Sequence, residues 1–269
     1  GLIALVLALI IITGEIDISV ASNMAMSAVI TSIFYQMGVN IWFSVLLGLI
    51  AGTIGGLLNG LIITKVKIHS MVVTLATQSL FRGIAYVLLG DRAVTGFPAR
   101  FMSLGQGYVG NSPVPLQLVM FMVLALICGL VLHKTKYGRY IYGIGNNETA
   151  ARFSGIPVDR IKTALFTLVG LVSAAAGILF VSRVGVCRPD LGEAFLFEIV
   201  TIVLLGGVSI YGGEGSIIGV VLSLFLIGLT RYGMILVNIR APVINIIIGS
   251  MLITAVVVPR LTRLIAREG

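Results

Sequence analysis

The chain has 269 residues, of which 58% are hydrophobic and only 10% are charged, and its mean hydropathy is +1.12. Soluble globular chains carry about 25% charged residues, so 18 basic and 10 acidic side chains are too few to cover a soluble domain of this size. The same apolar composition excludes a disordered chain. The net charge of +8 does not indicate a nucleic-acid partner, because the basic residues do not gather on one soluble segment.

A membrane-spanning helix needs about 20 residues, so a chain of this length has room for about eight to ten crossings. The apolar residues form continuous blocks and do not alternate with polar ones, which favours helices over the strands of a membrane barrel. We therefore predict an all-α polytopic membrane protein with about eight to ten transmembrane helices, some of them short or broken. Residues 1–269 are expected to form a single transmembrane domain in contact with a lipid bilayer.

Charged clusters divide the chain into successive apolar segments. The first, 1–13, is predicted to be part of a span, and because the chain starts inside this run we expect residues to be missing before Gly1. Residues 18–64 contain no charge and are too many for one helix, so a turn is predicted at 36–40. The other predicted segments are 18–35, 41–63, 71–90, 115–132, 163–182, 199–210, 217–232 and 241–259.

The charges between these segments predict the orientation of the chain in the membrane. The connection 133–162 carries six basic residues against two acidic ones, so we expect it on the cytoplasmic side. The connection 183–198 has two basic and three acidic residues and is expected on the far side, as is 91–114. The glycines and prolines of 91–114 favour a loop there over a short interfacial helix.

Glycines recur at four-residue steps within the segment 41–63 and form a stripe along one face of the predicted helix. Because glycine has no side chain, another helix can approach such a stripe closely. Packing within one subunit is the favoured interpretation, and a subunit interface or a lining of a transport pathway remains open. The four residues are Gly48, Gly52, Gly56 and Gly60.

Two carboxylates, Glu15 and Asp17, lie between apolar residues in the sequence Gly-Glu-Ile-Asp-Ile-Ser at 14–19. Ionisable groups at membrane depth are costly and usually face a cavity, a partner or a break in a helix. Two interpretations remain open. The carboxylates lie at the headgroup boundary between two spans, or they mark a broken helix.

A second glycine-rich interruption occupies residues 206–216. No Lys-Ser or Lys-Thr pair follows its glycines, so the segment lacks the signature of a phosphate-binding loop. We expect a turn between two partial helices. Nucleotide binding by this chain is not expected.

The segment 145–157 has the start and stop signals of a short helix within the basic connection. Asn147 is a suitable N-cap and Glu148 complements the positive end of the helix dipole. Gly155 and Pro157 provide the stop. A helix of two turns is unstable alone in water, so it needs a surface to pack on. A docking element for a cytoplasmic partner fits this requirement, and a helix lying on the protein's own membrane face is the alternative.

The sequence contains no motif for catalysis or metal binding. The two histidines, His69 and His133, lie at predicted span ends and are expected at the interface. The two cysteines, Cys128 and Cys187, do not have the spacing of a metal or redox site. An enzyme within the membrane is therefore a poor fit, and neither a metal nor another cofactor is expected on this chain.

Three stretches of the sequence resemble the permease subunits of bacterial ABC importers for monosaccharides, of the ribose, xylose, rhamnose and autoinducer-2 type. The stretches are Gly-Glu-Ile-Asp-Ile-Ser at 14–19, the connection from Gly138-Arg139 to Gly155-Ile156-Pro157, and the residues from Asp190-Leu191-Gly192 to Gly219. The last stretch is most similar to the autoinducer-2 and rhamnose branch. The sequence departs from the family at Glu15, where a second glycine is usual.

The resemblance implies an inner-membrane subunit that works with a second permease chain, identical or homologous. It also implies a cytoplasmic ATPase subunit that binds ATP and magnesium, and a periplasmic sugar-binding protein. The connection 133–162 would be the coupling loop. In this hypothesis Ala150, Ala151 and Phe153 pack into the ATPase while Glu148 and Arg152 contact its rim. The full set of coupling candidates is Gly145, Asn147, Glu148, Ala150, Ala151, Arg152, Phe153, Gly155 and Ile156.

A sugar should be held weakly along such a route, so small and polar residues are expected there. The candidates are Asp17, Ser19, Asn23, Asn59, Thr74 and Gln78. The alternative function is an ion-coupled secondary transporter in which Glu15, Asp17 or Glu198 carries the coupling ion. A third possibility is a membrane scaffold that transports nothing.

Overall fold

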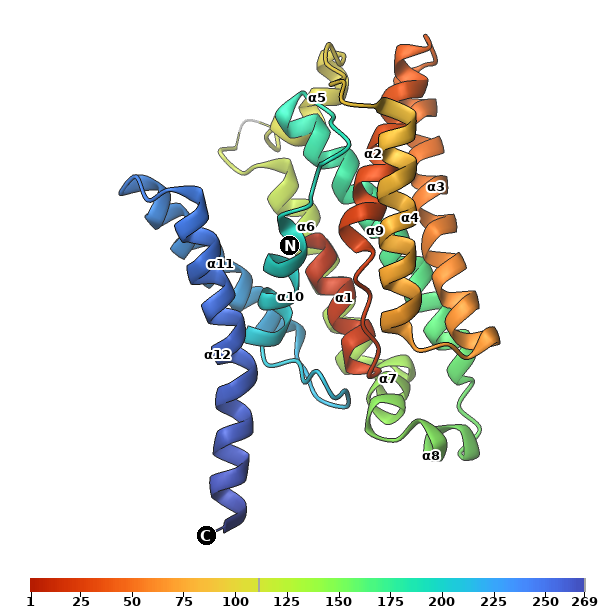
Figure 1. Cartoon of the computed structure of the whole chain (residues 1–269), viewed down its shortest axis with the longest axis vertical. Helices are drawn as coiled ribbons and strands as arrows, with labels where there is room; N and C mark the ends of the chain where they lie inside the picture. Colours follow the sequence, from red (N-terminus) through yellow and green to blue (C-terminus); the bar gives the residue numbers. More distant parts are fainter. Residues whose placement is uncertain (111, 269) are drawn as a thin grey trace.

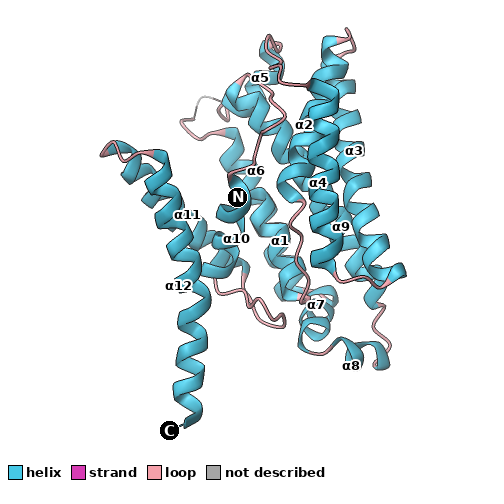
Figure 2. Cartoon of the chain, viewed as in Figure 1, coloured by secondary structure: helices cyan, strands magenta, loops and turns pink. Residues whose placement is uncertain are grey.

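The computed structural model describes the backbone of residues 1–110 and 112–268, and the side chains of these residues except 241, 256 and those from 258 onward. Within this part the chain forms twelve α-helices and one π-helical turn, joined by loops (Figure 2). The α-helices are α1 (Leu2–Ile12), α2 (Val20–Gln36), α3 (Ile41–Leu61), α4 (Ser70–Leu89), α5 (Ala99–Gln106), α6 (Leu116–Lys134), α7 (Lys136–Asn146), α8 (Glu148–Phe153), α9 (Val158–Val184), α10 (Phe195–Leu205), α11 (Ile217–Leu236) and α12 (Ala241–Glu268); the π-helical turn, η1, follows α3 at Ile62–Val66.

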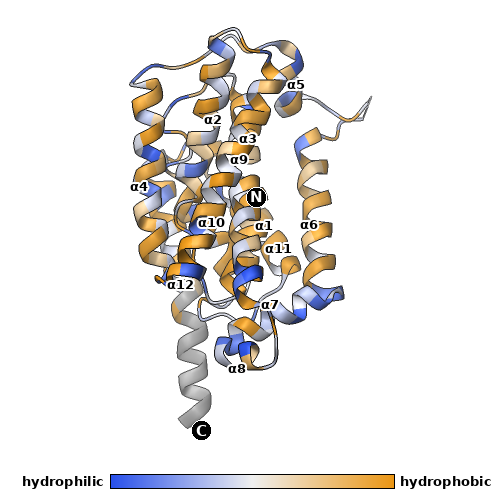
Figure 3. Cartoon of the chain, turned by 90° about the vertical axis from the view of Figure 1, so that its right-hand side faces the viewer, coloured by the Kyte–Doolittle hydropathy of each residue, from blue (hydrophilic) through white to orange (hydrophobic). Residues whose placement is uncertain are grey.

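Among the residues that the structure describes, five helical segments are long and apolar enough to cross a membrane, and three further apolar helices are shorter. The five are α3 with its π-helical end, α4, α6, α9 and α11, and the short ones are α1, α10 and the segment Pro242–Ala255 of α12. Hydrophobic residues follow these helices along most of their length (Figure 3). The prediction of an all-α polytopic membrane protein with some short helices is confirmed.

The helices α2, α3, α4 and α9 lie side by side as a bundle, and α1 lies between this bundle and α10 and α11 (Figure 1). All residues of α1 from Ile3 to Ile12 are buried, so this helix has protein on every side. The chain turns between α2 and α3 at Met37–Asn40, where Gly38 has a φ of +86°. This is the turn that the charge-free stretch predicts.

The glycines of α3 allow close contact with α2 and α9 inside the same chain. A Cβ atom on Gly48 would lie 2.0 Å from Thr31 Oγ1 of α2, and one on Gly56 would lie 2.3 Å from the Phe166 carbonyl oxygen of α9. Gly52 and Gly60 likewise face residues of α9, at 2.5 Å from Ala174 Cβ and 2.9 Å from Thr163 Cα. The backbones therefore approach more closely here than side chains would permit.

The connection 91–114 contains a helix, α5, where the composition favours a loop. Phe101 of α5 is fully buried, and Ser182 near the end of α9 donates a hydrogen bond to the Phe101 carbonyl oxygen at 2.6 Å and accepts one from the Gly105 N–H at 2.8 Å. These long-range contacts stabilise a helix that its glycines and prolines do not favour on their own. Local composition could not predict them, and the expectation of a loop was wrong.

Helix boundaries also differ from the predicted ones around the connection 133–162. The structure places a further helix, α7, before the predicted loop helix, which itself spans only α8. Helix α9 begins at Val158, five residues before the predicted segment, and so includes Asp159, Arg160 and Lys162. Helix α10 covers 195–205 in place of 199–210. At the starts of α9 and α10, charged residues taken as boundaries continue the helix because their side chains have partners or reach solvent.

Candidate translocation and coupling sites

The helix α1 and the helix α2 are separated by a non-helical stretch, Thr13–Ser19, in which Thr13, Asp17 and Ser19 are buried (Figure 1). Asp17 is only 2% exposed, and its Oδ1 accepts hydrogen bonds from the Ser19 N–H at 2.8 Å and the Ser19 hydroxyl at 2.6 Å. Asn59 of α3 donates from Nδ2 to the Ser19 Oγ at 2.9 Å, which ties the stretch to α3. The two carboxylates therefore lie in a non-helical break between α1 and α2, and their position relative to the lipid headgroups stays a prediction.

Four of the six predicted route residues lie at this break. Asp17, Ser19 and Asn59 form the cluster just described, and Thr74 of α4 donates to the Ile16 carbonyl oxygen at 3.4 Å and to the Ser70 carbonyl oxygen at 2.8 Å. The others are Asn23 of α2, whose Nδ2 donates to the Gly52 carbonyl oxygen at 3.0 Å, and Gln78, which is half-buried.

All of these except Gln78 are buried. None of the six lines either of two cavities in the described part of the chain, one at the first residues of α1 and one beside Lys65 and Asp159. Their hydrogen bonds join α2, α3, α4 and the break within one chain, so in this conformation they hold the break in place.

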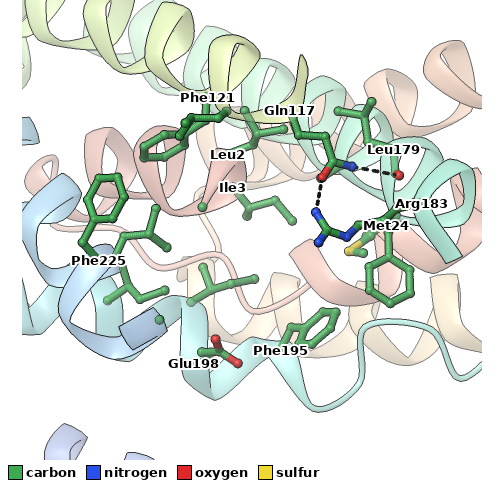
Figure 4. Close-up of a pocket in the computed structure, with 18 of the residues that line it drawn as sticks. Leu2, Ile3, Met24, Gln117, Phe121, Leu179, Arg183, Phe195, Glu198 and Phe225 are labelled. Atoms are coloured by element: carbon green, nitrogen blue, oxygen red, sulfur yellow. Dashed lines mark hydrogen bonds between the residues drawn. The ribbon is translucent and has the colours of Figure 1, made fainter. Parts of the chain in front are cut away.

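A cavity of about 570 Å³ lies at the first residues of α1, between α1, α2, α6, α9, α10 and α11. The side chains of Gln117 and Arg183 point toward each other at one end (Figure 4), with Arg183 Nη1 donating to Gln117 Oε1 at 2.7 Å. Glu198 lies on another wall and is paired with Arg231 of α11. Aromatic rings make up much of the remaining lining, from Phe121, Phe180, Phe195 and Phe225.

The cavity was not predicted from the sequence, apart from Glu198 as a candidate in the alternative function. Its polar residues lie on α6, α9 and α10, up to 81 positions apart from Gln117 to Glu198. Gln117 lies in the first turn of α6 and Arg183 in the last turn of α9, so each looks like an ordinary helix-end residue. No local pattern brings such residues together.

The helix α8 has the capping that its sequence predicts. The Asn147 side chain accepts a hydrogen bond from the Ala150 N–H at 2.9 Å, and Gly155 has a φ of +80°, which ends the helix. Phe153 is 88% exposed on its surface. A large apolar side chain at this exposure is a candidate contact for a partner protein.

Ala151 does not fit the expected contact with a partner. It is only 4% exposed, because it lies on the side of α8 that packs against the same chain. Ala150 and Arg152, on the other sides of the helix, are exposed. The sequence predicts the helix but not which of its faces is buried, so the assignment of Ala151 to a partner surface was wrong.

One lysine joins α8 to the break. Lys162 of α9 lies with its Nζ 2.5 Å from Glu15 Oε1 and 2.5 Å from Glu148 Oε2. The other oxygen of Glu148 accepts from Arg152 at 2.7 Å, and Arg152 contacts Asp159 Oδ1 at 2.5 Å. Partial burial alone would raise the pKa of Glu148, but the hydrogen bonds from Lys162 and Arg152 outweigh it and lower the pKa below its ordinary value.

The two glycine-rich interruptions meet at the same end of the molecule. The Gly213 N–H donates to the Ile12 carbonyl oxygen, the last of α1, at 2.8 Å. A Cβ on Gly145 of α7 would lie 1.8 Å from that oxygen and 2.3 Å from the Gly213 nitrogen. Gly212 has a φ of +82°, and a Cβ on it would lie 2.8 Å from the Gly14 nitrogen. We call this contact of Ile12, Gly14, Gly145, Gly212 and Gly213 the glycine junction.

Several apolar helices, a buried break and an exposed loop helix linked to that break define a multi-pass membrane permease. Residues 1–256 match the family described as "Branched-chain amino acid transport system / permease component". The chain belongs to this family, as its motifs predict, and it is a transporter subunit.

Three similar proteins are all described as "Autoinducer 2 import system permease protein LsrD". The one from Escherichia coli O9:H4 (strain HS) is 38% identical over 263 residues, which cover 96% of this chain and 79% of that protein. Those of Escherichia coli (strain K12) and Shigella flexneri match with the same identity and coverage. No solved structure matches the chain.

Proposed function

We propose that the chain is one transmembrane subunit of an ATP-driven importer in the bacterial inner membrane, and that it carries autoinducer 2 or a monosaccharide-sized polar molecule. The observation that carries this proposal is the helix α8, which ion pairs of Arg152 with Asp159 and of Glu148 with Lys162 hold to α9, and on which Phe153 is exposed. The identity to autoinducer 2 import permeases supports the solute class. Ribose and rhamnose are alternatives of the same size and polarity.

The partners in this proposal are those of a complete importer. A cytoplasmic ATPase subunit binds ATP and magnesium and docks on α8 within the loop 133–162. A second permease chain, a copy or a paralogue, completes the pathway, and a periplasmic binding protein delivers the solute. Phe153 and Ala150 face the ATPase, and Arg152 lies at the rim of the contact.

The solute route in this proposal passes through the cavity that Gln117, Arg183 and Glu198 line. Binding pockets for small molecules have volumes of about 300–1,000 Å³, and the cavity of about 570 Å³ falls in this range. Its aromatic rings suit the apolar faces of a sugar-like ring, and Gln117 and Arg183 suit its hydroxyl groups. The cluster of Asp17, Ser19 and Asn59 becomes part of the route when the break rearranges.

The experiment is co-expression of the chain with its candidate ATPase, permease and binding-protein partners, followed by reconstitution in liposomes. Wild-type chain should retain the ATPase on purification and accumulate solute only with ATP. Phe153→Ala should weaken ATPase retention by about tenfold or more, as for an aromatic anchor of an interface. Tyr137→Ala is the matched control, because Tyr137 is an exposed aromatic residue of α7 in the same loop.

The proposal is wrong if the chain alone accumulates solute from an ion gradient without ATP. That result would establish the ion-coupled alternative. Two of the carboxylates that would carry the coupling ion in this alternative already have a basic partner, since Glu15 is paired with Lys162 and Glu198 with Arg231. These pairs count against the ion-coupled alternative. Absence of solute flux with either energy source would identify a scaffold.

A further inference from the structure

Lys162 connects three separate elements through one ammonium group. It belongs to the second turn of α9, while Glu15 belongs to the break and Glu148 is the first residue of α8. Both carboxylates lie 2.5 Å from its Nζ, and the Lys162 side chain is only 5% exposed. A lysine has three N–H donors, so it can hold both carboxylates at once.

The contact is stiffer than a surface ion pair. Glu15 is 14% exposed, and within the described part of the chain its one ion pair is with Lys162. A buried carboxylate without its counterion is costly, so Glu15 and Lys162 must move together. On the other side, Arg152 holds Glu148 to Asp159, and this fixes α8 against the start of α9.

The glycine junction is a second contact between the connection 133–162 and the break, and it also links movement of α8 to the break. Helix α7, which leads into α8, touches the end of α1 at the glycine junction, where the Gly145 backbone lies against the Ile12 carbonyl oxygen. Glu15 comes three residues after Ile12, and Asp17 two residues after Glu15. A displacement of α8 therefore reaches the break at two points, one ionic and one steric.

We propose that Lys162 is the positioning residue that transmits movement of α8 to the break between α1 and α2. This inference deepens the proposed function and rests on it. When a partner displaces α8, Glu148 and Lys162 carry Glu15 with them. The stretch 13–19 shifts, and the hydrogen bonds of Asp17 and Ser19 with Asn59 are rearranged. Lys162 makes no contact with the solute in this scheme.

Lys162 could transmit movement from α8 to the break, or it could only neutralise the charge of Glu15, and two variants distinguish these roles. Lys162→Met leaves Glu15 buried without a counterion and should destabilise the chain. The double variant Glu15→Gln with Lys162→Met removes both charges, so the chain should regain its thermal stability and its retention of the ATPase. Lys162→Arg keeps a cation with several donors and should retain the function. Lys134→Met is the control, because Lys134 is exposed and at the end of α6 in the same connection.

The measured quantity is solute imported per ATP hydrolysed by the complete reconstituted complex. For the double variant we expect this ratio to fall by about tenfold, the usual size of coupling between two sites, while ATP hydrolysis continues. Lys162→Arg and Lys134→Met should stay near the wild-type ratio. If the double variant is both stable and fully coupled, Lys162 serves charge balance only and the inference is wrong.

Failure of the proposed function gives a different result. In that case the wild-type chain itself neither retains the ATPase nor requires ATP for uptake. The inference about Lys162 is overturned only when the wild-type complex is coupled and the double variant is equally coupled.

Discussion

Replacing Gly56 by alanine should separate α3 from α9. The added Cβ would lie 2.3 Å from the Phe166 carbonyl oxygen and 2.8 Å from the Gly170 Cα. Ordinary van der Waals contact begins at 3.4 Å, so the first distance is too short by 1.1 Å. Both neighbours are backbone atoms, which no change of side-chain conformation can move aside.

The cost follows from this geometry. Inserting a methyl group into a packed site costs about 1–3 kcal/mol, and we expect the upper end because the two helices must move apart. Alanine is also a better helix former than glycine by up to about 1 kcal/mol, which offsets part of the loss. The net destabilisation of Gly56→Ala should be about 2 kcal/mol, the difference between these two estimates.

The matched control is Gly83→Ala in α4. No atom lies within 4 Å of a Cβ at Gly83, so this variant should be neutral or more stable than wild type. Both variants are compared with wild type by unfolding in mixed micelles, which gives the free energy of unfolding. Equal stability of Gly56→Ala and Gly83→Ala would refute the close packing of α3 on α9.

Three further predictions concern other contacts. Gly145→Ala should reduce solute import by the reconstituted complex by about tenfold, because its Cβ would lie 1.8 Å from the Ile12 carbonyl oxygen; unchanged import would contradict the glycine junction. Ser182→Ala should lower the free energy of unfolding by about 1–3 kcal/mol through loss of two hydrogen bonds, and an unchanged value would mean that α5 does not need them. Because the pKa of Glu148 is lowered in the folded chain, its ionised form contributes stability above its unfolded pKa of about 4.3 and loses it as the pH falls through the lower folded pKa. The melting temperature of wild type should therefore exceed that of Glu148→Gln by a constant amount at neutral pH, with the difference disappearing under strong acid; a difference independent of pH would contradict this.

The class of fold could be predicted from composition and from the placement of charges, because lipid imposes a simple rule on them. Long runs without charge must be helices in a membrane, and the segment from Ile41 to Thr64 shows this plainly. The cap at Asn147 and the stop at Gly155 were predictable for a related reason, since both depend on local backbone chemistry.

Contacts between distant residues could not be predicted in this way. Glu15 and Lys162 are 147 positions apart, and nothing near either residue indicates the other. Lys162 was interpreted only as one of the positive charges that orient the chain. The sequence also could not predict which face of α8 is buried, because six residues are too short a pattern to define one. Ala151 was assigned to the wrong face for that reason.

Helix α9 is held at both of its ends. Near one end Asp159 and Lys162 tie it to α8, and near the other Ser182 ties it to α5. Its 27 residues extend for roughly 40 Å, more than the roughly 30 Å of membrane hydrocarbon. An intact helix does not shorten or stretch to absorb a push, so a tilt imposed at its first turn has to appear at its last. Helix α9 is therefore a single rigid element whose two ends can lie on opposite sides of the membrane.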